Sequence, residues 1–308
     1  MPKFSVSRSV TIEADPATVF NKVSDYNHWT TWSPWLVAES DAKVEVSPDS
    51  NSVGSVYQWE GDVVGAGELE HMALEHGRMI EDEIRFEKPW KSQSQITFEF
   101  EQVSGGTEVT WRMNGSLPWF MFWMKPMMEP FIGMDYRRGL SMLKEWIETG
   151  TIKSKTLVVG VQMAKPFQLA GVRKTCKVQE ISSVSKQAME EAKQKLKQHG
   201  VDATGLGATA YHDFKIKKQI MEFTAGFMVD QSVDIPGIDN CSIGHTKAFR
   251  VDHIGCFGHL GNGWYAGNQN VQAKKLKKKR TPSFEIYRNA NQDVPVEELV
   301  TEIYLPLK

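Results

Sequence analysis

Cysteine is scarce in this sequence, and no hydrophobic run is long. The 308 residues include only three cysteines, at positions 176, 241 and 256. Three scattered cysteines cannot build the disulfide framework of a small secreted domain, so we expect free thiols in a reducing compartment. No apolar run approaches the roughly 20 residues that span a bilayer, and the chain opens on a strand pattern rather than a signal peptide. The sequence therefore favours a cytoplasmic protein without membrane contact.

A strong charge of either sign is also absent. The chain carries 36 Lys and Arg against 38 Asp and Glu, a formal net charge of −2, which gives no general attraction to nucleic acid or anionic lipid. The basic run 274–280 is the exception. It follows an expected helix, and cations stabilise the carboxyl end of a helix dipole, so the run indicates a solvated helix end more than a phosphate site.

Several functional motifs are missing as well. The histidines and cysteines between Cys241 and His259 match no zinc-binding spacing. No Gly-x-Gly-x-x-Gly follows a strand and opens a helix, as a phosphate-binding loop would, and no helix-turn-helix with a basic recognition helix is evident. We therefore expect no metal, no cofactor and no direct binding to nucleic acid.

The tryptophans that are present divide the chain. Nine of the ten precede residue 150, whereas all three cysteines follow it. A chain of this length suits two domains of about 150 residues each, and the small polar segment 149–154 reads as a linker. We predict one domain at residues 1–150 and a second at residues 156–308.

The first half predicts an α+β domain in which a curved antiparallel sheet wraps around a helix. Residues 4–12 alternate as a strand, and Asp15-Pro16 is typical of a helix start. Short strands separated by turns follow over 42–113, and the apolar face of 131–147 predicts a long final helix. We expect a cavity between that helix and the sheet.

Four short motifs in this half resemble a known superfamily. They are Asp15-Pro16-x-x-Val19-Phe20, the loop Trp29-x-x-Trp32, the Gly-Gly-Thr turn at 105–107 and Gly139-Leu140-x-x-Leu143-Lys144. Together they look like the polyketide cyclase/SRPBCC (START-like) superfamily over nearly all of residues 1–150. The resemblance implies a helix-grip fold with an apolar ligand cavity. It does not name the ligand, because members include binders, transfer proteins and enzymes.

A run of methionine and aromatic residues, Trp119–Met128, separates the strands from the long helix. Soft, adaptable side chains suit a cavity lid, a docking surface for the second domain, or a surface for a partner protein or a second copy of the chain. The simpler interpretation is that the run packs under the long helix. Membrane contact is disfavoured, because the run is short and Pro126 and Pro130 interrupt it.

The second half predicts the same β-α-β-β order twice, offset by roughly 75 to 80 residues. The first copy has strands near 167–172, 208–214 and 221–229, with a helix that ends near Gly200. The second copy has strands near 245–251, 283–287 and 300–307, with a helix somewhere between 257 and 279. We expect the copies to pair two sheets about a pseudo-twofold axis, with a ligand groove at that axis.

The strand 283–287 carries one acidic residue, Glu285. Side chains on a strand alternate between faces, so Glu285 shares a face with Ser283 and Tyr287. Burying a carboxylate without a partner costs several kcal/mol or raises its pKa until it is neutral. We therefore expect a hydrogen-bond donor, a ligand or a cation beside it, and Lys247 or Arg250 on the neighbouring strand could form a structural ion pair.

Two aromatic residues complete the expected groove. The repeat pairs the strand of Tyr211 with the strand of Glu285, which makes Tyr211 the second wall. Trp264 on the second helix offers a stacking surface. That helix contains several glycines, each of which costs up to about 1 kcal/mol in a helix, so we expect it to be broken or to start late.

The second half contains three further motifs: Val251-x-His253-x-Gly255, Phe284-Glu285-Ile286-Tyr287 and the ending 300–307. Together they resemble the GyrI-like small-molecule-binding domain, also called the AraC-type effector-binding domain. It implies that Glu285 is the central acidic residue that meets cationic aromatic ligands. The implied ligand-binding residues are Glu285, Tyr287, Tyr211, Trp264 and His253.

Three functions fit these features. The first is binding or sensing of a small aromatic or cationic molecule, as in domains that often accompany a DNA-binding helix-turn-helix in transcription regulators. Since this chain shows no helix-turn-helix, regulation would act through a partner or by sequestering the ligand. The second is a hydrolase of strained or electrophilic molecules, with Glu285 as general base and Tyr287 as its catalytic neighbour. The third is a partner-docking protein that uses the Trp119–Met128 surface.

Overall fold

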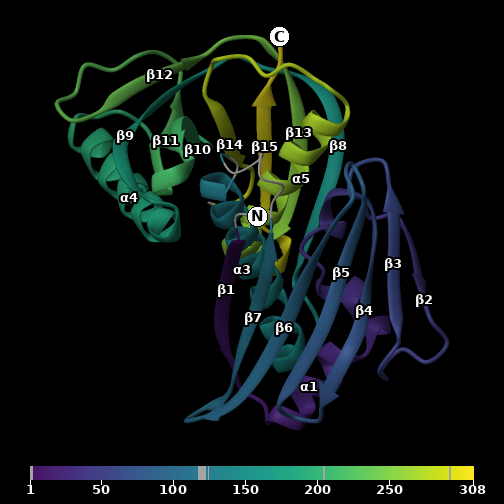
Figure 1. Cartoon of the computed structure of the whole chain (residues 1–308). Helices are drawn as coiled ribbons and strands as arrows, with labels where there is room; N and C mark the ends of the chain where they lie inside the picture. The colour runs from purple at the N-terminus through teal and green to yellow at the C-terminus, as the bar shows by residue number, and fades with distance from the viewer. Residues whose placement is uncertain (1–2, 117–122, 124, 204, 291–292) are drawn as a thin grey trace. The chain divides into compact units, whose positions relative to one another are not determined.

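The structure is a computed structural model that describes residues 3–116, 123, 125–203, 205–290 and 293–308. The chain divides into two compact units, Met1–Ile152 and Lys153–Lys308. Each unit has its own sheet (Figure 1). The two units are therefore described one at a time.

Unit 1 is a seven-stranded antiparallel sheet with one long helix. Its elements are β1 (Lys3–Ile12), α1 (Pro16–Ser24), η1 (Tyr26–His28), α2 (Trp29–Trp32), η2 (Leu36–Ala38), β2 (Lys43–Val46), β3 (Val56–Gly61), β4 (Gly65–Glu75), β5 (Met79–Lys88), β6 (Ser92–Val103), β7 (Gly106–Ser116) and α3 (Lys125–Thr149). The strand order is β1-β7-β6-β5-β4-β3-β2. This is the helix-grip arrangement that the strand and helix patterns predict.

Local sequence explains how the segment after β1 folds. The Asp15 carboxylate accepts a hydrogen bond from the Thr18 backbone N–H at 2.9 Å, and Pro16 takes the first helical position, as expected for a helix start. The tryptophan segment that follows is not an open loop. It forms the short helices η1 and α2. The Asp25 side chain caps the Asn27 N–H at the start of η1, and α2 follows without a side-chain cap.

Aromatic rings fill the space between the sheet of unit 1 and α3. The Trp111 ring of β7 stacks on the Tyr136 ring of α3, with centroids 3.9 Å apart. Trp32 packs edge-on against Trp111 at 5.5 Å. A Cβ at Gly139 of α3 would lie 2.9 Å from the Trp111 ring, so glycine there permits this close packing. The interior is lined by large aromatic side chains.

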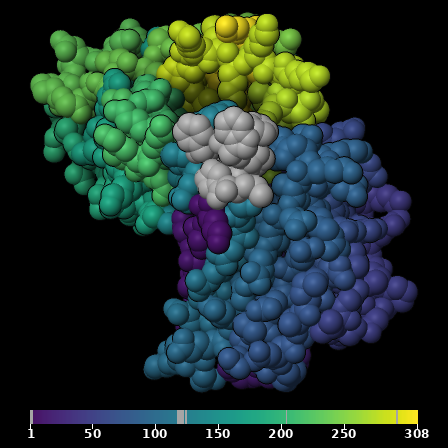
Figure 2. Space-filling view, in the orientation of Figure 1, coloured from purple at the N-terminus to yellow at the C-terminus, as the bar shows by residue number. Residues whose placement is uncertain are grey.

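The outer face of the same sheet is charged. Arg85 forms ion pairs with Glu68, Glu70 and Glu83, which alternate with buried apolar residues along β4 and β5. In Figure 2 the surface of unit 1 turned to the viewer is mostly blue, because strands of the sheet form it. The sheet thus has one solvated face and one packed face.

A buried polar pair joins β4, β5 and the end of α1. The His71 Nδ1 lies 2.5 Å from the Asp82 Oδ1, and the His71 Nε2 lies 2.7 Å from the Ser24 carbonyl oxygen. Neither His71 nor Asp82 is exposed. The Tyr26 ring stacks on the His71 ring at 3.9 Å. Burial raises the pKa of Asp82, and the hydrogen bond from His71 opposes that rise.

Unit 2 is one eight-stranded antiparallel sheet. Its elements are β8 (Ser154–Ala164), β9 (Phe167–Lys177), η4 (Val178–Glu180), α4 (Ile181–Gln198), β10 (Gly207–Lys215), η5 (Ile216–Lys218), β11 (Ile220–Val229), β12 (Asp239–Ile243), β13 (Thr246–Gly255), η6 (Phe257–His259), α5 (Leu260–Ala273), β14 (Ser283–Tyr287), η7 (Val296–Glu298) and β15 (Val300–Pro306). The strand order is β12-β9-β11-β10-β14-β15-β13-β8.

The predicted repeat is present, but the prediction that its two copies form two facing sheets is wrong. The equivalent strands β10 and β14 are hydrogen-bonded neighbours at the centre of a single sheet. The strands β8 and β12, which were not predicted, are exchanged between the repeats, since β8 pairs with β13 and β12 pairs with β9. Helix α4 packs on β9 and β11, and α5 packs on β13 and β15. The central strands therefore lie between the two helices.

Helix α5 is continuous from Leu260 to Ala273, although a 3-10 turn precedes it. The helix contains Gly261, Gly263 and Gly267, so neither the expected break nor a start beyond these glycines is found. A Cβ at Gly263 would lie 2.5 Å from the Ile303 Cδ1, and one at Gly267 would lie 2.7 Å from the Leu305 Cδ1. The glycines thus let α5 approach β15 closely.

None of the described helices combines the length and the apolar character of a membrane span.

The buried pair generates the first prediction. Asp82→Ala should destabilise unit 1 by about 3–5 kcal/mol, because it leaves the His71 imidazole buried without its partner. The matched control is Glu60→Ala, which removes an exposed partner of Lys88 and should leave the melting temperature nearly unchanged. Calorimetric unfolding of the full chain measures both. Equal effects of the two substitutions would contradict this role of Asp82.

Candidate functional site

Glu285 lies at the centre of the sheet in unit 2. Its strand β14 is bounded by β10 and β15, with Glu285 opposite Thr209 on one side and opposite Ile303 on the other. The side chain is completely buried. Helix α4 packs on one side of the central pair β10 and β14, and α5 packs on the other side. The carboxyl group therefore lies over the central strands, between the two helices.

Neutral hydrogen-bond donors surround this carboxyl group. Trp264 Nε1 of α5 donates to Oε1 of Glu285, and Tyr287 Oη donates to Oε2 at 2.8 Å. The Tyr211 hydroxyl of β10 also hydrogen-bonds the carboxyl group. Thr209 Oγ1 in turn lies 2.8 Å from Tyr287 Oη. Four of the five residues predicted as ligand-binding are therefore in direct contact around one group.

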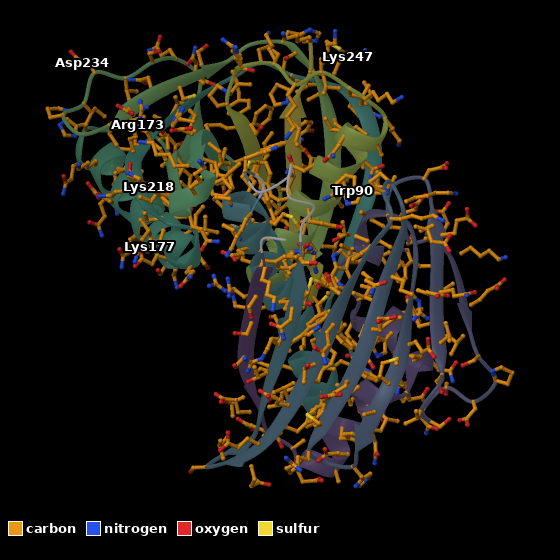
Figure 3. The ribbon with its side chains drawn as sticks, viewed as in Figure 1. Trp90, Arg173, Lys177, Lys218, Asp234 and Lys247 are labelled. Carbon is orange, nitrogen blue, oxygen red and sulfur yellow. The ribbon has the colours of Figure 1, made fainter. Side chains whose placement is uncertain are left out.

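The expected ion pair is not found among the described residues. Arg250 donates to Asp252 at 2.7 Å and also pairs with Glu302 at 2.7 Å. Lys247 is exposed on the surface of unit 2 (Figure 3). Alternation explains the difference for Arg250, because its partner Glu302 lies opposite Ile286, the neighbour of Glu285 on the other face of β14.

Burial controls the protonation of the site. Burial raises the pKa of Glu285, and the hydrogen bonds from Trp264, Tyr287 and Tyr211 only oppose this rise. Burial also raises the pKa of both tyrosines well above the ordinary value, and the nearby Glu285 charge adds to that shift. The tyrosines therefore remain neutral donors, while the carboxyl group holds its proton more tightly than an exposed glutamate does.

Aromatic rings enclose the group. The Tyr211 and Trp264 rings meet edge to face with centroids 5.0 Å apart. Phe257 of η6 meets Tyr287 in the same way at 5.5 Å and is 40% exposed. The sequence reasoning missed Phe257, although an aromatic residue directly before the second helix was a usable signal.

His253 is not brought to the carboxyl group. It lies on β13, opposite Thr301, which in turn lies opposite Tyr287. The ring is buried, and its Nε2 lies 2.9 Å from the Cys256 carbonyl oxygen. Burial lowers the pKa of His253, so the structure connects this residue with the turn before α5 rather than with Glu285.

The described residues hold no group of three or more His, Cys, Asp or Glu side chains that could bind a metal ion. Within the Trp119–Met128 surface, residues 119–122 and 124 lie outside the described part of the chain. Of the described members, Trp123 is 60% exposed and Met127 is 37% exposed.

Unit 1 has buried donors of its own. Trp32 Nε1, Trp111 Nε1 and Tyr136 Oη are buried and have no acceptor among the described residues. Leaving such a donor unsatisfied costs about 1–3 kcal/mol each. An ordered water between the sheet and α3 would satisfy them.

Two family models match the chain. Residues 3–148 match polyketide cyclase / dehydrase and lipid transport, and residues 159–308 match the GyrI-like small molecule binding domain. The chain therefore joins a polyketide cyclase-type (SRPBCC) domain to a GyrI-like small-molecule-binding domain, and both resemblances are confirmed. No protein of curated function matches it.

Solved structures resemble parts of the chain at low identity. A protein from Chromobacterium violaceum is 16% identical with a TM-score of 0.37, over 47% of this chain and 97% of that one. The Aha1 dimer from Colwellia psychrerythraea is 16% identical with a TM-score of 0.35, over 48% and 98%. The EcmrR C-terminal domain is 18% identical with a TM-score of 0.39, over 50% and 98%. Similarity at this level gives no information about the ligand or the activity of this chain.

The buried carboxyl group predicts a pH-dependent stability. Because the folded-state pKa of Glu285 is raised, the folded protein keeps a proton that the unfolded chain has lost, and stability falls as the pH rises through this window. Glu285→Gln removes the titration. As the pH rises from about 4 to about 8, the free energy of unfolding of the variant should increase relative to that of the wild type by on the order of 1 kcal/mol or more.

Thermal unfolding across this pH range measures the difference, with Glu297→Gln at an exposed position as the control. A difference between wild type and Glu285→Gln that stays constant with pH would show that the buried group does not titrate as described.

Proposed function

We propose that unit 2 binds a small cationic aromatic molecule, with Glu285 as its counter-charge. The observation that carries this proposal is a fully buried carboxyl group whose hydrogen-bond partners, among the described residues, are neutral donors on aromatic side chains. A carboxylate without a cation is expensive inside a protein, so a structural role would favour a built-in Lys or Arg. A ligand that carries a positive charge would offset the free-energy cost of the buried carboxylate.

The aromatic side chains suit such a ligand. A cation beside the faces of Trp264, Tyr211 and Tyr287 gains cation–π attraction, and the low local dielectric strengthens its attraction to the carboxylate. The ligand takes the place of the Trp264 N–H at Oε1 of Glu285. Trp264 lies on α5 and is partly exposed, so its ring can turn outward to admit the ligand.

Proton release accompanies binding. A cation requires the ionised carboxylate, whereas burial favours the protonated form of Glu285. Binding therefore displaces a proton, and affinity falls as the pH drops.

A hydrolase is the second candidate, because Tyr287 contacts a carboxyl group whose raised pKa suits a general base. Glu285 would activate water, and Tyr287 would position it. Binding is the stronger proposal, since the carboxyl oxygens have no solvent exposure and already accept hydrogen bonds from neutral donors.

As a ligand sensor, the protein would act through a partner that recognises its exposed surface. Trp123, which precedes α3, and Met127 and Phe131 in the first turns of α3 are exposed apolar residues suited to such contact. The three free cysteines fit a reducing, cytoplasmic setting.

Calorimetric titration with benzyltrimethylammonium tests the binding proposal. The cation should bind saturably to the full chain, and Glu285→Gln should weaken it by at least about tenfold, or 1.4 kcal/mol, because the counter-charge is lost. Neutral benzyl alcohol should not distinguish the variant from the wild type. Affinity for the cation should fall from about pH 8 to pH 5.

Equal affinity of both proteins for the cation would sink the binding proposal. Turnover of p-nitrophenyl acetate that Glu285→Gln abolishes, while binding of the cation persists, would establish the hydrolase instead.

A further inference from the structure

We propose that unit 2 has a second small-molecule site, which takes an apolar amine at the joined ends of β9, β11 and β12. This inference goes beyond the function proposed above and does not depend on Glu285. A pocket of ≈ 510 Å³ lies there, within the range of about 300–1,000 Å³ that is usual for small-molecule sites.

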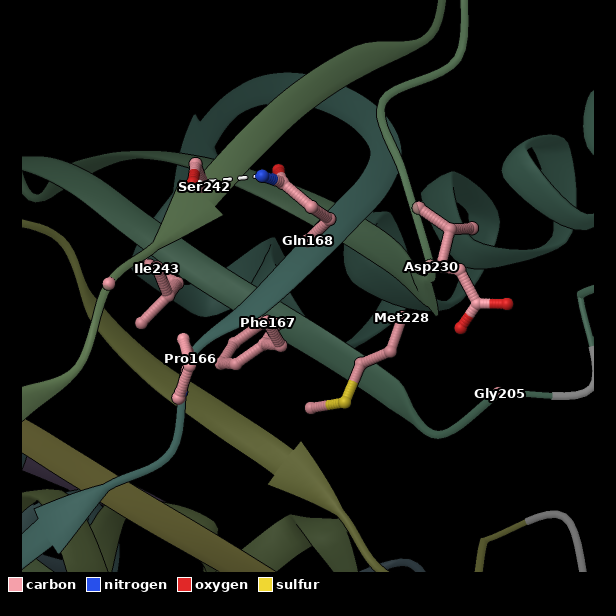
Figure 4. A pocket seen from close by; sticks show the side chains of 10 residues that line it. Pro166, Phe167, Gln168, Gly205, Met228, Asp230, Ser242 and Ile243 are labelled. Carbon is pink, nitrogen blue, oxygen red and sulfur yellow. Dashed lines mark hydrogen bonds between the residues drawn. The ribbon is translucent and has the colours of Figure 1, made fainter.

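The pocket has an apolar floor. Figure 4 shows the side chains of Pro166, Phe167, Met228 and Ile243 gathered around it. Phe167 and Met228 are only partly buried. A ring and a thioether that stay accessible offer good contact to an aromatic or branched ligand.

This floor lies on the sheet face away from α4. Phe167 and Met228 pack into the apolar cluster that contains Phe284 and Ile286, and the Phe167 ring meets the Phe284 ring at 5.4 Å. Phe284 and Glu285 are consecutive on β14, so their side chains point to opposite faces. The pocket is therefore distinct from the Glu285 site.

The repeat places smaller residues at the position equivalent to the pocket floor. Phe167 of β9 pairs with Ile243 of β12. In the other repeat, offset by 79 residues, the equivalent pair is Thr246 of β13 with Ala164 of β8. The second pair is small and buried, at 7% and 3% exposure. In the first pair Ile243 is equally buried, at 5% exposure, and the larger Phe167 stays partly exposed at the pocket.

Charge indicates the ligand class. Asp230 is the charged residue among those that line the pocket, none of which is basic, and it is exposed at the rim. An apolar body on the floor with an ammonium group toward Asp230 satisfies both features. Because Asp230 is exposed, its attraction is screened and contributes only a few-fold in affinity.

Titration of 2-phenylethylamine, followed by protein NMR in the Glu285→Gln background, tests the site with the central carboxylate removed. Saturable binding should shift signals of residues that line the pocket. Met228→Trp should weaken it by at least about tenfold, because the indole fills the pocket. Asp230→Asn should weaken the amine about threefold and leave 2-phenylethanol unchanged.

Three results would overturn the proposal: no saturable binding of the amine, shifts confined to the α4 and α5 face, or unchanged affinity in Met228→Trp with its melting temperature intact. Asp230→Asn alters an exposed side chain, so it keeps the charge test valid if Met228→Trp misfolds. Failure of benzyltrimethylammonium to bind at Glu285 would leave these results untouched.

Discussion

The second unit is organised around the buried carboxyl group of Glu285, which has no charged partner among the described residues. Glu285 is held by donors from three elements, with Tyr287 on its own strand, Tyr211 on β10 and Trp264 on α5. These contacts depend on the duplication, which places the equivalent strands β10 and β14 side by side between the two helices. They also depend on the glycines of α5, which let that helix lie close to β15. The duplication that builds the sheet therefore also brings the residues of the site together.

Glu285 differs from the buried acids Asp82 and Glu302, which have basic partners. In unit 1 the buried Asp82 has a basic partner, His71, and aromatic rings fill the space around them. In unit 2 the buried Glu302 pairs with Arg250 and Arg288, whereas the partners of Glu285 among the described residues are neutral. A paired charge stabilises a fixed structure, whereas an uncompensated acid keeps an attraction available for a cation that arrives from outside. This contrast is the physical reason for assigning recognition to Glu285.

Much of the fold could be predicted from local sequence. Strand 283–287 and the helix start at Asp15 follow from alternation and capping, which act over a few residues. The same alternation could have revealed the His71–Asp82 pair, because each residue lies between apolar neighbours on the packed face of its strand. Strands β8 and β12 were missed, since edge strands are specified by the partner they pair with, and that partner lies in the other repeat.

By itself, the sequence determined the two families, the repeat and the residues that meet at the acidic centre, since periodicity and motif are local properties. Only the tertiary structure decided that the repeats form one sheet, that Arg250 turns to Asp252 and Glu302, and that His253 binds the turn at Cys256. Register and strand exchange join residues that are distant in the chain. The partner of a buried charge is therefore fixed by the whole sheet rather than by its neighbours in sequence.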